Sequence, residues 1–315
     1  MKRIIIINGT LGVGKSSVAK HLSETLKKSC YLEGDSVSKT INGFHVYSEN
    51  KIKQSIEEIG TIAKYSLKHG LETIIIDFIF EKPTHISYLK NLLLKYVDEV
   101  RIFYLEADIN EINSRIETRN RTEFQSEKSR TNEILKEQNN YKHDITLGIS
   151  IQTSNRSIED ISSDIAFQLR HRLNAAAFIK DSQGRFLFCH RRDIPNKTKG
   201  FQLPQGGIDP FEIPKETIKR ELLEETFLKD YKTIAQTKIA LPYYWKKGQI
   251  YDHYIGQLQY YFLLEVDNLQ KKQIIESHDF DFYSWEPINT ILSKAVSYKK
   301  EVYTNAWKKL VLYNV

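Results

Sequence analysis

A glycine-rich segment at residues 9–16, Gly-Thr-Leu-Gly-Val-Gly-Lys-Ser, constrains the fold of the N-terminal half more than any other feature. It follows Arg3–Ile7, an apolar run typical of a buried strand, and it opens Ser16–Lys28, whose apolar residues recur at helical spacing. A glycine-rich turn that joins a buried strand to a helix belongs to proteins in which helices pack on a sheet. The sequence therefore predicts an α/β fold for this half.

The rest of the N-terminal half repeats this alternation. Further strands are expected at 31–32, 72–77, 99–105 and 149–153, and helices at 51–69, 84–95, 110–117, 131–141 and 157–172. Continuous apolar strands separated by helices favour a parallel sheet that is covered on both faces.

The pattern changes near residue 172. Shorter strands are expected at 173–179, 185–190, 233–240 and 257–266, with a hairpin turn at 181–184 and helices at 214–226 and 299–312. At ~100–200 residues per domain, a chain of 315 residues holds two domains. We therefore expect domains at 1–172 and 173–315.

Composition limits the classes of protein to consider. The net charge is only +6, from 46 basic and 40 acidic residues, which permits phosphate-rich ligands but does not indicate a protein that coats nucleic acid. The two cysteines, Cys30 and Cys189, exclude a disulfide scaffold and indicate a reducing compartment. The longest aliphatic run, Ile4–Ile7, is far below the ~18 residues of a membrane helix. We expect a cytoplasmic protein with no membrane partner; the sequence indicates no oligomeric state.

The glycine-rich segment fits the pattern G-x-x-x-x-G-K-S/T, whose backbone N–H groups surround phosphates. Lys15 would reach the β/γ oxygens of ATP, and the Ser16 hydroxyl would ligate Mg²⁺. Asp77 ends the Ile74–Ile76 strand, where a carboxylate can hold the water shell of Mg²⁺. A strand-end cap is the alternative role for Asp77.

On this motif, residues 1–172 resemble the P-loop kinases of small substrates and of polynucleotides. The resemblance implies that Asp35, in Tyr31-Leu-Glu-Gly-Asp35, acts as general base on the acceptor hydroxyl; a helix cap is the alternative. It also places Arg115, Arg119 and Arg121 in a lid over ATP, whereas a solvated helix face is the plainer interpretation. The residues expected to bind ATP are Gly9, Gly12, Gly14, Lys15, Ser16, Ser17, Arg119 and Arg121.

A second motif lies in the C-terminal half: Gly206-x5-Glu212-x7-Arg220-Glu221-Leu222-Leu223-Glu224-Glu225. The last three glutamates are spaced i, i+3 and i+4, so they share one face of a helix and repel one another. Mg²⁺ or Mn²⁺ would relieve that repulsion, and such a metal neutralises phosphate oxygens and lowers the pKa of bound water. Arg220 is placed to orient a glutamate, and Glu212 is the candidate.

This pattern matches the Nudix box at every defined position but one, where Phe227 replaces a glycine that usually ends the helix. Residues 200–209, Gly-Phe-Gln-Leu-Pro-Gln-Gly-Gly-Ile-Asp, and the strand at 256–264 are similar to bacterial RNA 5′-pyrophosphohydrolases and diadenosine polyphosphate hydrolases. The resemblance implies that residues 173–315 form an α/β/α sandwich.

The same resemblance implies site residues. Glu221, Glu224 and Glu225 would bind metal, and Asp279 would serve as a further ligand or as a base. Tyr298 would stack on a nucleobase; a partly buried structural aromatic is the alternative. The aromatic and basic residues of 243–247 either meet nucleotide as well or form an ordinary loop. The residues expected to bind substrate are Arg191, Arg192, Gln205, Gly206, Tyr298 and Lys299.

We therefore expect a bifunctional nucleotide enzyme. Its Nudix domain would be a Mg²⁺-dependent pyrophosphohydrolase acting on 5′-triphosphorylated RNA ends or dinucleoside polyphosphates, and its kinase-like domain would use ATP. In one alternative, a small-molecule kinase is the main activity and the hydrolase is accessory. In another, the P-loop domain is a non-catalytic ATP sensor that regulates hydrolysis.

Overall fold

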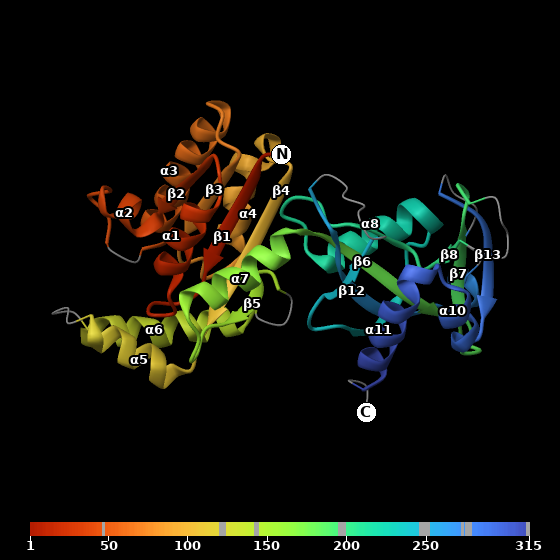
Figure 1. Ribbon diagram of the computed structural model, residues 1–315. Helices are drawn as coiled ribbons and strands as arrows, with labels where there is room; N and C mark the ends of the chain where they lie inside the picture. Colours follow the sequence, from red (N-terminus) through yellow and green to blue (C-terminus); the bar gives the residue numbers. More distant parts are fainter. Residues whose placement is uncertain are drawn as a thin grey trace. The chain divides into compact units, whose positions relative to one another are not determined.

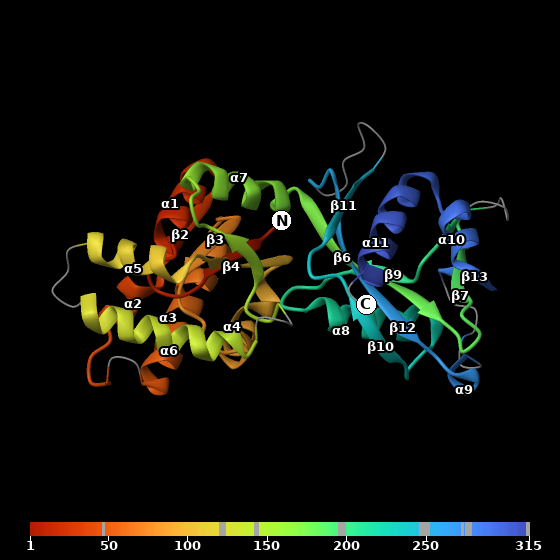
Figure 2. The same cartoon turned by 90° about the horizontal axis from the view of Figure 1, so that it is seen from below.

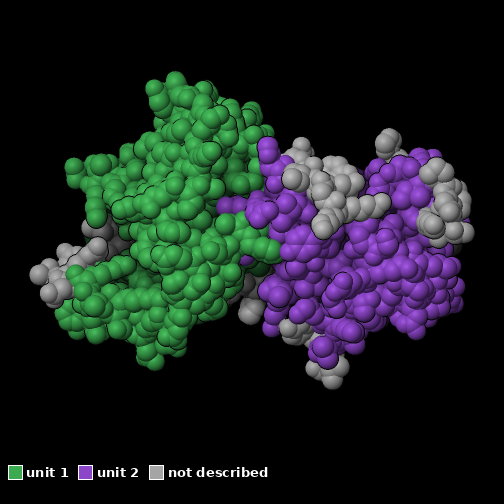
Figure 3. Space-filling view, viewed as in Figure 1, with its two compact units in different colours: residues 1–167, 209–211 green, residues 168–208, 212–315 purple. Residues whose placement is uncertain are grey.

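The computed structural model describes residues 1–45, 48–119, 124–141, 145–194, 200–245, 253–271, 274 and 279–312 (Figure 1). The chain divides into two compact units, coloured separately in Figure 3. Unit 1 comprises Met1–Phe167 with Asp209–Phe211, and unit 2 comprises Gln168–Ile208 with Glu212–Val315. The domain boundary expected near residue 172 stays a prediction. In the part of the chain that is described, no helix is both long and apolar enough to cross a bilayer.

Unit 1 is built on a parallel sheet in the order β2-β3-β1-β4-β5 (Figure 1). Its strands are β1 (Arg3–Asn8), β2 (Ser29–Glu33), β3 (Thr73–Asp77), β4 (Glu99–Glu106) and β5 (Ile149–Gln152). Its helices are α1 (Lys15–Thr25), α2 (Gly34–Lys39), α3 (Glu49–Lys68), α4 (Pro83–Leu93), α5 (Ile109–Thr118), α6 (Phe124–Asn139) and α7 (Ile158–Leu169), with a 3-10 turn at Leu94–Tyr96. The predicted parallel sheet is confirmed.

The isoleucine runs explain why both faces of this sheet carry helices. Ile4 and Ile6 pack with Ile56 and Ile59 of α3 in one core cluster. Because side chains alternate along a strand, Ile5 and the other odd residues point to the opposite face, where α1 contacts β1 and β3. Every one of these isoleucines is completely buried. The carboxyl ends of β1 and β3 thereby lie next to the N-terminus of α1, where the glycine-rich loop turns (Figures 1 and 2).

Unit 2 contains a mixed sheet in the order β10-β12-β6-β7-β13. Its strands are β6 (His171–Lys180), β7 (Phe186–Arg191), β8 (Phe201–Gln202), β9 (Gln205–Gly207), β10 (Lys232–Gln236), β11 (Leu241–Tyr244), β12 (Gly256–Glu265) and β13 (Phe280–Glu286). Its helices are α8 (Pro214–Thr226), α9 (Asn268–Lys271), α10 (Ile288–Lys294) and α11 (Lys300–Leu312), with a 3-10 turn at Ser297–Lys299. β6 and β12 run parallel, and the remaining pairs are antiparallel.

Helices from two distant parts of the chain contact this sheet. α8 contacts β6 and β9, whereas α11 contacts β11 and β12. The core under α11 contains Tyr303 and Leu310 together with Phe178 and Tyr261 from the sheet. β9, which carries Gln205 and Gly206, pairs with Asn174–Ala176 of β6 and so lies beside α8.

Two expectations for this half are corrected. The strand expected at 233–240 ends at Gln236, because the Thr237 hydroxyl accepts a hydrogen bond from the Tyr261 N–H at 3.0 Å and takes the place of a backbone carbonyl. Tyr243 and Tyr244, expected in an aromatic loop, belong instead to the strand β11 (Leu241–Tyr244). Lys246 and Lys247, from the same expected loop, lie outside the described residues.

Candidate functional site

The glycine-rich loop has the backbone that a phosphate cradle requires. Gly9 has φ 134°, and a Cβ there would lie 2.6 Å from the Leu105 carbonyl oxygen of β4. Gly14 is the left-handed residue before α1. Asn8, fully buried at the end of β1, fixes the start of the loop: its side chain donates to the Phe80 and Leu147 carbonyl oxygens and accepts from the Gly9 and Phe80 N–H groups.

Lys15, Ser16 and Asp77 meet at this loop. Lys15 Nζ donates to the Thr10 carbonyl oxygen at 2.8 Å, within the loop itself. Burial lowers the pKa of Lys15, and the charges of Asp35 and Asp77 partly restore it. The Ser16 hydroxyl donates to Asp77 Oδ2 at 2.5 Å, so the two oxygens expected near Mg²⁺ are adjacent. Burial raises the pKa of Asp77, against the hydrogen bond from Ser16 and the charge of Lys15. Ser17 is exposed on α1 beside them.

The three arginines expected in the lid differ in where the structure places them. Arg115 donates from Nη2 to the Thr153 carbonyl oxygen at 3.0 Å and from Nη1 to the Val13 carbonyl oxygen at 3.5 Å, so it supports the loop from behind. Arg119 is exposed after α5, and its charge lowers the pKa of Lys15, which places it near the loop. Arg121 lies outside the described residues.

In unit 2, the spaced glutamates lie on α8. The helix starts with Pro214 at its first turn, and Glu216 Oε2 accepts from the Ile213 N–H at 3.1 Å. Arg220 holds Glu212 through two hydrogen bonds of 3.1 and 2.9 Å, which is the contact expected from the spacing. It also donates to Glu221 at 2.6 Å and to Glu224 at 3.3 Å.

Phe227 ends α8 in the left-handed conformation, with φ 61° and ψ 11°. Its N–H donates to the Leu223 carbonyl oxygen at 3.2 Å. The turn that a glycine would usually make therefore forms with phenylalanine. α8 therefore ends directly after Thr226, and Glu221, Glu224 and Glu225 all lie within the helix.

Glu225 is the most enclosed of the carboxylates. It is 6% exposed, and its Oε2 accepts from the Gln205 N–H at 2.8 Å. Burial raises the pKa of Glu225 well above its usual value, and the charges of Glu221 and Asp279 raise it further. Burial also raises the pKa of Glu221, against the pull of Arg220. Gly206 makes room for Glu221: a Cβ on Gly206 would lie 1.8 Å from the Glu221 carboxyl carbon.

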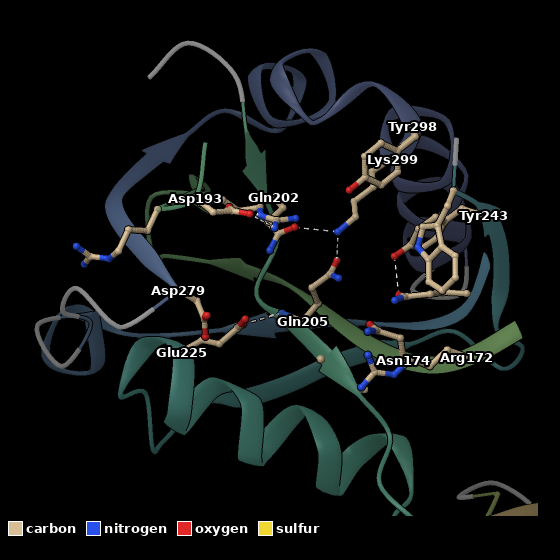
Figure 4. A pocket seen from close by; sticks show the side chains of 16 residues that line it. Arg172, Asn174, Asp193, Gln202, Gln205, Glu225, Tyr243, Asp279, Tyr298 and Lys299 are labelled. Atoms are coloured by element: carbon tan, nitrogen blue, oxygen red, sulfur yellow. Dashed lines mark hydrogen bonds and ion pairs between the residues drawn. The ribbon is translucent and has the colours of Figure 1, made fainter. Parts of the chain in front are cut away.

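A pocket of about 680 Å³ opens beside Glu225 (Figure 4). Glu225 and Asp279 lie along one side, while Tyr298, Lys299 and Tyr243 lie along another. Arg191 and Arg192 also line it. Arg191 is paired with Asp193, its Nε lying 2.8 Å from Asp193 Oδ1, and Arg192 Nη2 donates to the Phe280 carbonyl oxygen at 3.2 Å. Of the acidic and basic residues expected in this half, Glu225, Asp279, Arg191, Arg192 and Lys299 line this cavity, whereas Glu221 and Glu224 are not among its lining residues.

Lys299 is a buried cation in this pocket. Its Nζ donates to Gln205 Oε1 at 2.7 Å and to Gln202 Oε1 at 2.9 Å. It also lies 5.8 Å from the Tyr243 ring centre and 5.9 Å from the Tyr298 ring centre. The side chain is 2% exposed, and burial lowers the pKa of Lys299 to about 7. Tyr298 is 36% exposed, so part of its ring is available for stacking.

Sequence reasoning missed several lining residues. Arg172 and Asn174 lie on β6 and share one face because they are two residues apart. Gln202, on β8, also lines the pocket and accepts from Lys299. Tyr243 was considered only as part of a loop; it is buried in β11, and its hydroxyl donates to Gln257 Oε1 at 2.5 Å. The polar residues at 172 and 174, next to an alanine run, are the only local signal.

Comparison with known proteins agrees with this geometry. The family model of the NUDIX domain matches residues 170–306, and that of an AAA domain matches residues 5–136. The RNA pyrophosphohydrolase of Sulfurovum sp. (strain NBC37-1) is 32% identical over 145 residues, which are 42% of this chain and 88% of that protein. The chain belongs to the Nudix family.

The RNA pyrophosphohydrolase of Proteus mirabilis (strain HI4320) is similar, at 33% identity over 44% of this chain and 82% of that protein. Among solved structures, the tunicamycin resistance protein of Deinococcus radiodurans aligns at 19% identity and a TM-score of 0.39, over 53% of this chain and 96% of that one. By the two family models, the chain combines a NUDIX domain with an AAA domain that contains the P-loop.

The Nudix glutamates have the chemistry of a site for a hard cation, but their side chains are not arranged as a cage. Among the residues described, no three acidic, histidine or cysteine side chains converge as they stand. Arg220 holds Glu221 and Glu224, and Glu224 is largely exposed. Burial is the main cause of the raised pKa values of Glu221 and Glu225, and the negative charges of neighbouring carboxylates raise both further. Oxygen-only donors with that charge fit Mg²⁺ or Mn²⁺.

Proposed function

We propose that the Nudix half is a divalent-metal-dependent pyrophosphohydrolase whose substrate is a 5′-triphosphorylated RNA end. This proposal rests on one observation: a single pocket has carboxylates along one side and a cation with aromatic rings along another. Glu225 and Asp279 lie at one side, and Lys299 with Tyr298 lies at the other. A phosphate chain would span the two, with its nucleoside against the aromatic ring. Dinucleoside polyphosphates carry the same groups and are the alternative substrate class.

In this proposal, Glu221, Glu224 and Glu225 would hold the cation. The cation, when bound, neutralises phosphate oxygens and favours deprotonation of the attacking water. Lys299, Arg191 and Arg192 bind phosphate oxygens, and Tyr298 stacks on a base. Asp279, whose charge already acts on Glu225, accepts the proton of the water at its carboxylate.

The test compares product release from 5′-triphosphorylated RNA and from diadenosine tetraphosphate. Purified full-length protein is assayed with Mg²⁺ and without ATP, next to Glu225→Gln and to Glu301→Gln, an exposed acid on α11. Conversion of RNA to the 5′-monophosphate by the native protein and by Glu301→Gln, but not by Glu225→Gln, supports the proposal. Cleavage of the dinucleotide alone assigns the alternative substrate, and cleavage of neither rejects the hydrolase proposal.

We propose a second activity for the P-loop half: transfer of the γ-phosphate of ATP to a hydroxyl group. The contact between Ser16 and Asp77, next to buried Lys15, supports ATP-dependent chemistry. Asp35, close enough for its charge to act on Lys15, would accept the hydroxyl proton. Binding of a non-hydrolysable ATP analogue, with Lys15→Met as the variant, tests the nucleotide site. A non-catalytic ATP sensor would bind the analogue but phosphorylate no acceptor.

A further inference from the structure

A cluster of lysines lies on the surface of unit 1, where α3 contacts the 3-10 turn at Leu94–Tyr96. Lys64 Nζ lies 4.9 Å and Lys68 Nζ 5.3 Å from the centre of the Tyr96 ring. Lys95 directly precedes Tyr96 and is exposed. The hydrogen bond with Lys64 lowers the pKa of Tyr96, and the charges of all three lysines lower it further. Three positive charges, here called the lysine cluster, therefore act on one small area of the surface.

The lysine cluster lacks an acidic counterpart in the stretches of chain that the structure describes. There, no carboxylate forms an ion pair with Lys64, Lys68 or Lys95. A lysine in the last turn of α3 is expected from the helix dipole, but this explains Lys68 alone. Positive charges over one ring repel one another, so a polyanion bound across them would relieve that repulsion.

An aromatic pair lies next to these lysines at the end of α3. The rings of Tyr65 and His69 are stacked, with centres 3.9 Å apart and planes at 25°. The Tyr65 carbonyl oxygen accepts from His69 Nδ1 at 2.8 Å, which fixes the histidine ring. Tyr65 is 64% exposed, so most of its surface faces solvent. An exposed aromatic pair that is already stacked offers a nucleobase a surface on which to stack.

Helical geometry places the lysines and the aromatic pair side by side. Lys64 and Lys68 are four residues apart and follow one line along α3. Tyr65 and His69 have the same spacing and follow the next line. The apolar residues of α3 pack in the core, so both lines remain on the outer side of the helix. Proteins hold single strands with this combination, because phosphates contact the cations while bases stack on the rings.

We propose that the lysine cluster and the stacked pair of Tyr65 and His69 form a docking surface for single-stranded RNA. A flexible strand matches both the charges and the rings, whereas an acidic peptide or an anionic membrane matches the charges alone. The choice of RNA over DNA rests on the substrate proposed for the Nudix half. Docking itself requires neither of the reactions proposed above.

The experiment measures the anisotropy of a fluorescent 5′-hydroxyl oligouridine of about 20 nucleotides with the full chain, in EDTA, at about 50 to 200 mM salt. The hydroxyl end and the lack of metal keep hydrolysis out of the measurement. The variants are Lys64→Gln combined with Lys68→Gln, Tyr65→Ala and Tyr65→Phe. The control combines Lys20→Gln on α1 with Lys53→Gln near the start of α3, which removes the same charge from exposed positions. Unlabelled oligouridine, oligodeoxythymidine, polyglutamate and phosphatidylserine vesicles compete at equal charge concentration.

We expect the double lysine variant to bind more weakly and to reduce the slope of log Kd against log salt by about 1.4, because each phosphate contact on a single strand contributes about 0.7. Tyr65→Ala should raise Kd about 5-fold or more at an unchanged slope, as the loss of one base stack would. Tyr65→Phe and the control should keep the native Kd and slope.

A slope that the lysine change leaves unaltered overturns the proposal, and so does equal binding by Tyr65→Ala and Tyr65→Phe. Stronger competition by oligodeoxythymidine, polyglutamate or vesicles than by oligouridine also overturns it. Because the assay needs no catalysis, each of these outcomes leaves the proposed hydrolysis and phosphate transfer to their own tests.

Discussion

The backbone N–H of Gln205 donates a hydrogen bond to Glu225 Oε2 at 2.8 Å. The side chain of the same glutamine accepts from Lys299 Nζ at 2.7 Å. One residue of β9 therefore fixes both the buried carboxylate and the buried ammonium of the Nudix pocket. The ionisation of the Glu225 carboxylate is therefore linked to that of the Lys299 ammonium through one hydrogen-bond network. The proposed metal-binding and phosphate-binding functions of the pocket depend on that same network.

Replacing Glu225 by Gln should lower the rate of hydrolysis but raise the stability of the folded chain. We expect hydrolysis to fall by ~100-fold or more, as for the loss of a metal ligand. The pKa of Glu225 is raised in the folded chain, so its charge costs stability at neutral pH, and this cost disappears as the pH falls through the raised value. Glu225→Gln should therefore unfold at higher urea concentration than the native chain at pH 7 in EDTA. An active variant would remove Glu225 from the site, and a less stable one would contradict the argument from burial.

Lys299 also predicts a pH dependence of stability, but it is a base whose pKa is lowered, whereas Glu225 is an acid whose pKa is raised. Burial lowers its pKa from 10.5 to about 7. Between these values the unfolded chain binds a proton that the folded chain has released, so the contribution of Lys299 to stability rises with pH over that window. Below about pH 7 both states are protonated, and the cost of burying the charge is complete.

The same titration should affect substrate binding. KM for triphosphorylated RNA should rise from about pH 6 to about pH 9 as the ammonium is lost, whereas Lys299→Met should show a high KM throughout. A KM for Lys299→Met that equals the native value at low pH would show that Lys299 does not bind phosphate.

Phe227 carries a conformational cost that glycine would avoid. It adopts φ 61°, a region that costs an L-residue ~1–2 kcal/mol, while its side chain is 43% exposed. Part of the gain is lost because glycine is more flexible in the unfolded chain, so Phe227→Gly should raise the free energy of unfolding by ~0.5–1 kcal/mol. Phe227→Ala keeps the Cβ and should bring no such gain in urea unfolding. Equal stabilisation by both would attribute the effect to the exposed ring.

Lys15→Met should disable only the P-loop half. The ammonium lies within the loop, where it would contact ATP phosphates, so we expect phosphate transfer to fall by ~100-fold or more. Hydrolysis of triphosphorylated RNA should stay within a factor of ~2 of the native rate, because the residues proposed for it belong to unit 2. Lys20→Met, on the exposed side of α1, is the matched control. A parallel loss of hydrolysis would support regulation by the P-loop half.

Local patterns predicted the parts of the fold that depend on neighbours in sequence. The isoleucine runs, the glycine-rich turn and the glutamate helix follow from periodicity and spacing. β11 was missed because Pro242 argues against a strand. Its pairing explains the exception, since β11 pairs only with β12 among the described strands, and an edge strand tolerates a residue that cannot donate. The buried positions Leu241 and Tyr243 alternate with exposed ones, as a strand requires.

In the candidate site, too, the features that depend on neighbours in sequence were predicted, and those that depend on distant residues were missed. The spacing of Glu221, Glu224 and Glu225 predicts a shared helix face without knowledge of the fold. The burial of Lys299 depends instead on Gln202 and Gln205, which are almost a hundred residues earlier and reach it through pairing of β8 and β9. No local pattern encodes that proximity, and Arg172 was missed for the same reason.

Gly206 has a consequence for genetics, because a Cβ there would lie 1.8 Å from the Glu221 carboxyl carbon. Gly206→Ala would displace that carboxylate by steric contact while leaving every ionisable group, and hence the net charge, unchanged. The substitution lies in unit 2 and leaves the residues of the P-loop as they are. It would thus provide a separation-of-function allele, in which a cellular phenotype reports the loss of the proposed RNA-end hydrolysis while ATP-dependent chemistry continues.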